Sequence, residues 1–391
     1  MTVESRKHNA AVLVGNGLSI AFNPELKLDS ITREMIARMQ GATDNGDKVI
    51  HAMNEIARRS GPPEEVTDED FEKLVGAFDS EARTLEELGK LAELVEAEDT
   101  ALQSAIAEVS KFSDRVRDRG LSYVLEVVTD RSRADHILHK EVHDVLRAII
   151  DSFDGVVTFG NLNYDTLLLS GLLAVDAPLS DLGRGVVPIS IRVVDSDGET
   201  TSSIPYDAKY LRTSLDFPPG ERYRVRLLQL HGSLTFWGQV EGDVHIKVPI
   251  QSLRDHNIWS GLREAEPRWR PSVVLANQRE KARHVERYPY RLAYEGFAAS
   301  LTEADHWLII GYSFRDSCVN EVLRREFITR KDKPNVLVST YGALPTDEEI
   351  ATAIGWGAED GDAKWLTVNR DGVRGLQNDF DWFLFAPRKS S

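Results

Sequence analysis

Short apolar runs that end in glycine or in small polar residues recur along this chain. Residues 10–14 are all apolar and stop at Gly15, and residues 306–310 are mostly apolar and stop at Gly311. Runs of this length are typical of strands that are buried on both faces of a parallel sheet. Similar runs predict further strands at residues 156–159, 226–230, 272–276, 335–340 and 365–368.

Helical patterns lie between several of these runs. Apolar positions predict helices at residues 166–175, 317–328 and 372–385. Because strands that alternate with helices indicate βαβ units, the sequence predicts an α/β fold with a Rossmann-like, doubly wound and mostly parallel sheet. The stretch 176–222 is rich in Pro, Gly, Ser and Asp, which predicts long loops and a hairpin near residues 195–198.

A long helical stretch interrupts this alternation. Between residues 46 and 150 the residues Glu, Lys, Arg, Ala and Leu dominate, and apolar positions recur at helical spacing. A Gly-Pro-Pro sequence at residues 61–63 predicts a break between helices. We therefore expect a sheet domain made of residues 1–45 and 151–391, and a large α-helical insertion of residues 46–150. The amphipathic helices of this insertion are the expected assembly surface.

Composition limits the classes of function. The 391 residues carry a formal charge of −16, which makes direct nucleic-acid binding unlikely as a general property of the surface. Cys318 is the only cysteine, so an internal disulfide and a zinc site of paired thiolates are excluded. We expect Cys318 to be a buried, inert thiol. The sequence has no bilayer-spanning apolar run and no secretory signal pattern, so we expect a cytoplasmic protein that does not use a membrane.

Three of the predicted strands end in turns of glycine and small polar residues, at residues 15–19, 160–165 and 311–316. In open parallel sheets, ligands bind outside the carboxyl ends of the strands, so these turns are expected to face one crevice. Glycine permits close approach to a phosphate, and a following helix N-terminus presents amide groups to it. Three such turns indicate a nucleotide. The first turn has Ile20 where a dinucleotide-binding fingerprint has its third glycine.

Three polar side chains near these turns are candidates for chemistry. Asn163 offers both a hydrogen-bond donor and an acceptor, and Asp165 follows it closely. His231 stands at the end of a predicted strand, and imidazole is the side chain that exchanges a proton most readily near neutral pH. Each residue also has a structural interpretation, because Asn163 and Asp165 could cap the next helix and His231 could be a hydrogen-bonded core residue.

The order of these motifs resembles the sirtuin family. Sirtuins carry a glycine turn ending in Ser, an Asn-x-Asp motif, a catalytic His followed by Gly, and a later Gly-Thr/Tyr-Ser turn. The corresponding segments are residues 15–19, 161–165, 231–233 and 311–313. The chain is more similar to the sirtuin-like domains of bacterial antiviral systems, which share Asn-Tyr-Asp, His-Gly-Ser and Gly-Tyr-Ser-Phe-x-Asp followed by an Asn, here Asn320. The four zinc-binding cysteines of deacylating sirtuins are missing.

The resemblance implies NAD⁺ as the substrate, no metal ion, and cleavage to nicotinamide and ADP-ribose. It implies that His231, Asn163 and Asp165 are catalytic. His231 would take a proton from water or from a ribose hydroxyl, and Asn163 would hold that water or hydroxyl. Asp165 would contact the nicotinamide amide or nearby backbone. Phosphate and ribose would be bound by residues of the glycine turns: Gly15, Asn16, Gly17, Ser19, Gly311 and Ser313.

Such an activity needs an off state, because an unregulated enzyme would deplete the NAD⁺ of its own cell. We expect control by homo-oligomer assembly or by a partner, and the resemblance implies a HerA-like DNA-translocating ATPase or a short Argonaute-type protein. The main alternative is a non-catalytic module that senses NAD⁺ or ADP-ribose and regulates a partner protein. A protein deacylase or an ADP-ribosyltransferase is a further alternative.

Two other features are expected to be structural. His136, His139 and His143 share one face of a predicted helix, but the apolar residues among them favour an ordinary amphipathic helix over a metal site. The basic run at residues 279–291 is interrupted by glutamates, which favours a solvated helix face or a subunit contact over a phosphate or nucleic-acid site.

Overall fold

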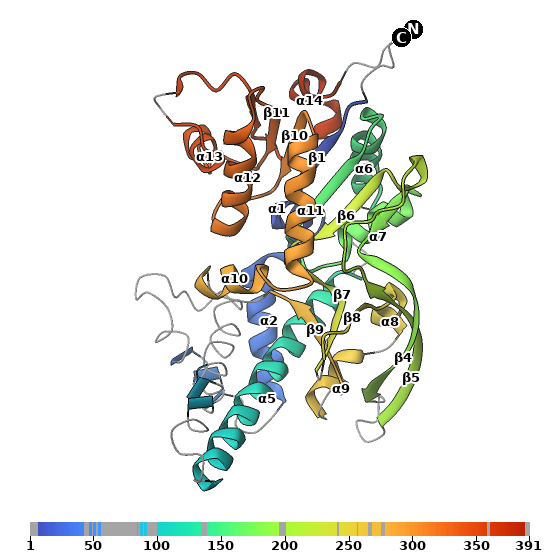
Figure 1. Cartoon of the computed structure of the whole chain (residues 1–391), viewed down its shortest axis with the longest axis vertical. Helices are drawn as coiled ribbons and strands as arrows, with labels where there is room; N and C mark the ends of the chain where they lie inside the picture. Colours follow the sequence, from blue (N-terminus) through green and yellow to red (C-terminus); the bar gives the residue numbers. More distant parts are fainter. Residues whose placement is uncertain are drawn as a thin grey trace.

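The computed structural model describes residues 7–42, 100–133, 139–194, 201–240, 242–255, 257–264, 268–274, 278–357 and 360–387, with short pieces between residues 47 and 91. Its upper part in Figure 1 is a seven-stranded parallel sheet of order β12-β11-β10-β1-β2-β6-β3. The strands are β1 (Ala10–Val14), β2 (Val157–Asn161), β3 (Leu179–Asp181), β6 (Val225–Gln229), β10 (His306–Ile310), β11 (Asn335–Ser339) and β12 (Leu366–Asn369). The predicted α/β fold with a parallel sheet is confirmed.

Helices cover both faces of this sheet, so it is doubly wound. In β1, Val12 and Val14 point to one face while Ala11 and Leu13 point to the other. A strand that is buried from both sides needs apolar residues at every position, which explains its unbroken apolar run. The first face packs against α1 (Asn16–Phe22), α6 (His139–Ser152), α7 (Leu167–Ala174) and α14 (Phe380–Phe385), and the second against α11 (Tyr290–Glu303), α12 (Ser317–Thr329) and α13 (Asp347–Ile354).

The direction in which strands are added reverses at β1. The chain first adds β2 and β6 on one side of β1, and later adds β10, β11 and β12 on the other side. The sheet therefore has a topological switch point between β1 and β10, where sheets of this kind bind ligands. The register aligns the carboxyl ends at this point, because Val14 lies opposite both Asn161 and Ile310.

A second, antiparallel sheet lies below the first in Figure 1. Its order is β4-β5-β8-β7-β9, and it packs with helices around a separate core that includes Trp237, Trp259 and Val124. The strands are β4 (Gly183–Val194), β5 (Thr201–Leu211), β7 (Gly232–Gln239), β8 (His245–Lys247) and β9 (Trp269–Val273). The neighbouring helices are α2 (Leu28–Gly41), α5 (Thr100–Arg131), α8 (Ile250–Asp255) and α9 (Ile258–Glu264). The helix α10 (Gln278–Val285) packs on α11 and α12 instead.

This second sheet corrects the expectation of long loops in residues 176–222. That stretch contains both strands of the hairpin formed by β4 and β5, which confirms the hairpin expected near residues 195–198. Ile189, Ile191 and Val193 are buried and the residues between them are exposed, which is the alternation of a half-buried strand. The polar and proline-containing composition that suggested loops belongs to the exposed face of this hairpin.

Two further boundaries differ from expectation. The strand expected at residues 272–276 is β9, which ends at Val273 and pairs with β7 in the antiparallel sheet. The helix expected over residues 372–385 is confined to a 3₁₀ turn at Leu376–Asn378 and to α14. Asp379 caps α14 through its side chain, so this helix begins only at Phe380.

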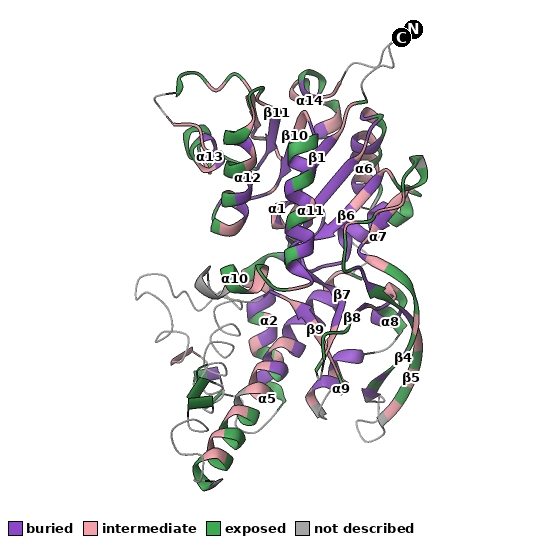
Figure 2. Cartoon of the chain, in the orientation of Figure 1, coloured by how far each residue is buried: buried purple, intermediate pink, exposed green. Residues whose placement is uncertain are grey.

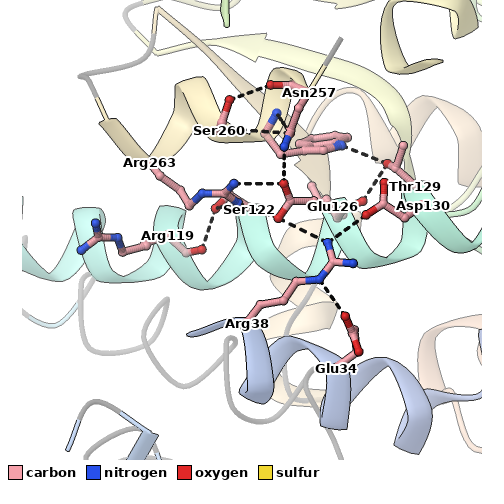
Figure 3. A network of polar contacts seen from close by, with 12 residues as sticks. Glu34, Arg38, Arg119, Ser122, Glu126, Thr129, Asp130, Asn257, Ser260 and Arg263 are labelled. Atoms are coloured by element: carbon pink, nitrogen blue, oxygen red, sulfur yellow. Dashed lines mark hydrogen bonds and ion pairs between the residues drawn. The ribbon is translucent and has the colours of Figure 1, made fainter. Parts of the chain in front are cut away.

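The described helices of residues 46–150 pack in different places. The C-terminal half of α5 is buried against α2 and the second sheet, whereas its N-terminal half is largely exposed (Figure 2). A polar network centred on Glu126 joins α5 to α2 and α9 (Figure 3). By contrast, α6 packs on the parallel sheet.

The break expected at residues 61–63 lies outside the described residues, and the division into a sheet domain and a helical insertion stays a prediction. Although α5 is 32 residues long, none of the helices that the structure describes, α5 included, is apolar over enough of its length to cross a membrane.

Candidate functional site

Buried polar side chains lie at the carboxyl edge of the parallel sheet, where its central strands end. Asn161 ends β2 and lies opposite Gln229 at the end of β6. Both side chains are buried, and the Asn161 amide donates to Gln229 Oε1 at 2.8 Å. The same amide group contacts the backbone of Asn163 through both its nitrogen and its oxygen, which fixes the turn that follows β2. This edge is therefore rigid where the candidate residues begin.

The first and third glycine turns pack against each other backbone to backbone. The amides of Gly15 and Gly17 donate to the carbonyls of Ile310 and Gly311, each at 2.9 Å. A Cβ atom on Gly17 would lie 2.5 Å from Gly311 Cα, and Gly311 itself has a left-handed φ of 59°. Only glycine fits this contact. These two amides are engaged within the protein and do not serve as donors to a ligand.

Asn163, Ser19 and Asp165 form a buried hydrogen-bonded chain beside this contact. Asn163 Nδ2 donates to Ser19 Oγ at 3.0 Å and to the Gly15 carbonyl at 3.1 Å. The Ser19 hydroxyl then donates to Asp165 Oδ2 at 2.7 Å. The other carboxylate oxygen of Asp165 accepts from the amide of Leu167 at the start of α7. Asp165 therefore has the capping role of the structural interpretation and also a link to the glycine turn.

Burial raises the pKa of the Asp165 carboxyl, and its hydrogen bonds from Ser19 and Leu167 offset only part of this effect. The carboxylate has no cation among the contacts described for it, so its negative charge is held by neutral dipoles alone. A positively charged group that approached it would be stabilised.

His231 connects β6 to β7 and is buried. Its carbonyl accepts from the amide of Val274, directly after β9. Its Nε2 atom lies 3.3 Å from the Tyr294 hydroxyl of α11 and 3.3 Å from Asp316 Oδ2. Two groups that can carry or accept a proton thus converge on this imidazole nitrogen.

Asp316 is the N-cap residue of α12 and is held from two sides. Its Oδ1 accepts from the amides of Cys318 and Val319, and its Oδ2 contacts Lys281 Nζ at 3.0 Å as well as His231. Burial acts to raise the pKa of the Asp316 carboxyl, but the hydrogen bonds and charges of His231 and Lys281 outweigh it and lower this pKa well below its ordinary range. Asp316 is therefore an anion at neutral pH.

The turn after β10 is fixed by its own side chains. The Tyr312 hydroxyl lies 2.7 Å from Asn320 Oδ1, and the Asn320 amide donates to the Phe314 carbonyl at 2.7 Å. Phe314 has a positive φ of 58°, a backbone conformation that is uncommon for aromatic residues and marks strain at functional turns. Asn320, noted in the sequence for its position after the third turn, thus holds that turn in place.

The structure joins the predicted residues into two clusters. Asn163, Asp165, Ser19 and Gly15 share direct hydrogen bonds, and Gly17 packs on Gly311. His231 belongs to the second cluster, with Asp316.

Tyr164 bridges the two clusters. Its hydroxyl donates to the Val274 carbonyl, and its own carbonyl accepts from the amide of Leu234 on β7. The Val274 amide donates to the His231 carbonyl, and Leu234 follows His231 by three residues in the sequence. A residue between Asn163 and Asp165 is thereby tied to the strand ends that position His231.

Three residues do not lie where the sequence analysis predicted. The Asn16 side chain donates to the Leu26 carbonyl at 3.4 Å, and the Ser313 side chain is exposed, so neither belongs to a cluster in this structure. Cys318, expected to be buried, is half-buried in the first turn of α12, where burial raises the pKa of its thiol.

Sequence reasoning gave no role to Lys281, Tyr294 or Gln229. Lys281 lies within the basic run that was expected to be a solvated face, and Arg283 and Arg287 of that run are indeed exposed. The Lys281 side chain differs from them, because it is only 13% exposed and reaches Asp316. Asp316 had a visible signal, since it closes the third turn motif, but its pairing with His231 depends on packing between distant elements.

A cavity of about 280 Å³ lies next to β9, between α5, α10 and α11. Its lining includes Arg117, Asp118, Arg270 and His284, and it contains none of the predicted site residues. Both guanidinium groups contact Asp118, so the cavity shows no clear preference for a charged ligand.

Metal binding was not expected from the sequence. Within the part of the chain that the structure describes, no three His, Cys, Asp or Glu side chains gather as metal ligands. His136 lies outside that part, so the three-histidine face is not described as a whole.

The arrangement places the imidazole of His231 beside the carboxyl group of Asp316, and places the Asp165 carboxyl group in a hydrogen-bonded chain with Ser19 and Asn163. No protein-family model matches the chain, and no curated protein is significantly similar to it.

Proposed function

We propose that this protein hydrolyses NAD⁺ at the bond between nicotinamide and ribose, giving nicotinamide and ADP-ribose. The observation that carries the proposal is the buried His231–Asp316 pair, which lies near the same switch point as the Asn163–Ser19–Asp165 chain. The two glycine turns lie at the carboxyl ends of β1 and β10, which is where sheets of this kind bind dinucleotides. The order of the sirtuin-like motifs supports the same assignment.

The reaction suits these residues. When the bond breaks, its electron pair goes to the nicotinamide nitrogen, which becomes neutral, and the ribose carbon becomes an oxocarbenium-like cation. A water oxygen then bonds to that carbon and loses a proton. His231 accepts this proton, directly or through a ribose hydroxyl, and Asn163 orients the water or hydroxyl. Asp316 contacts the Nε2 atom of His231 and orients the imidazole for this step.

Asp165 and Ser19 position Asn163 in this proposal. Because Ser19 accepts from Asn163 and donates to Asp165, the Asn163 amide is held in one orientation. A group held by a packed hydrogen-bond chain loses little entropy when the substrate binds. The proposal extends to depletion of NAD⁺ in antiviral defence, with activity controlled by self-assembly or by a HerA-like ATPase partner.

The test is the release of nicotinamide and ADP-ribose from NAD⁺, followed by chromatography, with the protein alone and with a co-encoded ATPase where one exists. We expect His231→Ala to lower turnover by about 10²–10⁴-fold, the usual cost of losing a general base. The control is His245→Ala, which removes an imidazole from β8 outside both clusters and should keep turnover within about threefold.

Two results would contradict the proposal. Equal turnover by the wild-type protein and a folded His231→Ala variant would remove His231 from the reaction. Binding of intact NAD⁺ by calorimetry, without turnover under any condition, would instead identify a non-catalytic sensing module.

A further inference from the structure

Lys281 is a largely buried cation on a helix that also has exposed positions. It lies in α10, where Ala282 and Arg283 are exposed. The Lys281 ammonium group nevertheless contacts Asp316 Oδ2 at 3.0 Å, with 13% of the side chain exposed. Burying a lysine side chain costs conformational entropy and desolvation free energy. A surface lysine that only kept the protein soluble would not be held in such a contact.

The same carboxylate oxygen serves Lys281 and His231. Asp316 Oδ2 lies 3.3 Å from His231 Nε2, while Oδ1 is occupied by the two amides at the start of α12. The helix cap prevents the carboxylate from turning away from either partner. Because both nitrogens contact one oxygen, the ammonium and the imidazole lie within about 6 Å of each other, a distance at which charges interact strongly in a protein interior.

The charged and titratable groups around His231 come from three elements. Asp316 and Cys318 belong to α12, with Tyr312 in the preceding turn, Lys281 belongs to α10, and Tyr294 belongs to α11. Burial raises the pKa of both the Tyr294 and Tyr312 hydroxyls and of the Cys318 thiol, so these groups stay neutral near pH 7. Among the described contacts, the balance of charge at the imidazole is therefore set by Asp316 and Lys281.

We propose that Lys281 is a positioning residue that offsets the charge of Asp316, so that Asp316 orients His231 without forcing its imidazole to stay protonated. An unbalanced carboxylate would hold the imidazole as a cation, which cannot accept a proton. The ammonium shares the carboxylate and keeps the imidazole neutral at physiological pH. Its importance for turnover rests on the proposed NAD⁺ hydrolysis, whereas its effect on His231 does not.

The experiment is an NMR titration of the His231 imidazole in the full-length protein. The resonance is assigned by its absence in His231→Ala. In Lys281→Met the pH midpoint of the titration should move upward by about one to two units, because a cation within about 6 Å has been removed. In Lys281→Arg, which keeps the charge, the midpoint should stay within about half a unit of the wild-type value.

The matched control is Arg283→Met, which removes the same charge from the exposed side of the same helix and should leave the midpoint unchanged because solvent screens it. A midpoint in Lys281→Met equal to that of the wild type, or moved equally by Arg283→Met, overturns the inference. Should Lys281→Met fail to fold, Asp316→Asn tests the arrangement from the other side. Asparagine can still cap α12, and the midpoint should move downward. A midpoint that stays in place or rises in that variant overturns the inference as well.

The titration needs no turnover, so its outcome is separate from that of the proposed function. If NAD⁺ is hydrolysed, the acidic limb of the rate profile of Lys281→Met should move to higher pH by the same amount as the titration midpoint. A loss of rate that is uniform over pH would indicate a purely structural role and would overturn the inference.

Discussion

Glu126 and Asp316 are both buried carboxylates that contact two basic side chains, and they differ in what those partners can do with a proton. Each side chain is about 9% exposed. Glu126 links α5 to α2 and α9, helices that lie below the parallel sheet in Figure 1. Asp316 instead follows β10 and caps α12, at the carboxyl edge of that sheet. The comparison separates a structural ion-pair network from a candidate catalytic one.

The partners of Glu126 are permanently charged. Arg263 donates to both of its oxygens at 3.0 Å, Arg38 contacts Oε2 at 3.4 Å, and the amide of Asn257 contacts Oε1 (Figure 3). Although burial acts to raise the pKa of Glu126, the hydrogen bonds and charges of these partners lower it overall. Since arginine does not release a proton in proteins, this network holds three helices together and carries out no proton transfer.

The partners of Asp316 are a lysine and a histidine, and histidine exchanges a proton near neutral pH. One more difference is that Asp316 caps a helix that begins at the switch point, while Glu126 lies within the C-terminal half of α5. A buried carboxylate therefore indicates chemistry only when a titratable partner and a ligand-binding edge accompany it. The following predictions test this distinction.

The largest expected effect is on the structural network. Glu126→Ala should lower the free energy of unfolding by roughly 3–5 kcal/mol, because Arg38 and Arg263 would lose the carboxylate that compensates their charges. Denaturant unfolding followed by circular dichroism measures this change. Below its unfolding transition the variant should keep the wild-type rate of NAD⁺ cleavage.

The control is Glu108→Ala on the same helix. The Glu108 side chain is 71% exposed, so its removal should change stability by less than about 0.5 kcal/mol. A Glu126→Ala variant that is as stable as Glu108→Ala would mean that the network in Figure 3 does not hold the helices together.

The second effect concerns the backbone contact that brings the glycine turns together. Gly311→Ala should cost about 2–5 kcal/mol, because a methyl group would overlap the backbone of Gly17 and the residue would keep a left-handed conformation. Gly342→Ala is the matched control, since Gly342 also has a positive φ but open space around the added atom. It should cost only about 1–2 kcal/mol. Equal losses in the two variants would show that the close approach of the turns is not tight.

The smallest effect depends on pH and belongs to Asp316. Its pKa is lowered in the folded state, so the carboxylate contributes stability that is present above the ordinary pKa of 3.8 and is lost as the pH falls below it. Asp316→Asn should therefore be less stable than the wild type by roughly 1–3 kcal/mol at pH 7. This difference should shrink as the pH is lowered from about 5 to 3.

Thermal or denaturant unfolding of both proteins across that pH range makes the measurement. If the difference in stability between the two proteins stays constant with pH, the charge of Asp316 does not contribute to stability. The contrast between Asp316 and the ion-pair network of Glu126 would then lose this support.

The parallel sheet was predictable because its signal is local. Strands such as β1 and β10 are buried on both faces, so their consecutive residues are nearly all apolar. A hairpin was predicted near residues 195–198, but the long strands β4 and β5 on either side of it were not, because their alternation of buried and exposed positions was obscured by Pro188 and by serines on the exposed face. Its partners β7 and β9 come from a later part of the chain, and no local pattern shows that pairing.

The candidate site divides in the same way. The sequence by itself determined the three turns, the positions of Asn163, Asp165 and His231 beside them, and the absence of a thiolate zinc site, because glycine, asparagine, histidine and cysteine carry these properties wherever the chain puts them.

Only the tertiary structure decided that Ser19 joins Asn163 to Asp165, that Gly17 packs on Gly311, and that Asp316 shares one oxygen between His231 and Lys281. These contacts link residues that are far apart in the sequence. They exist because the strand order places the carboxyl ends of β1, β2 and β10 at one edge, and because two helices of the second half of the chain pack against that edge.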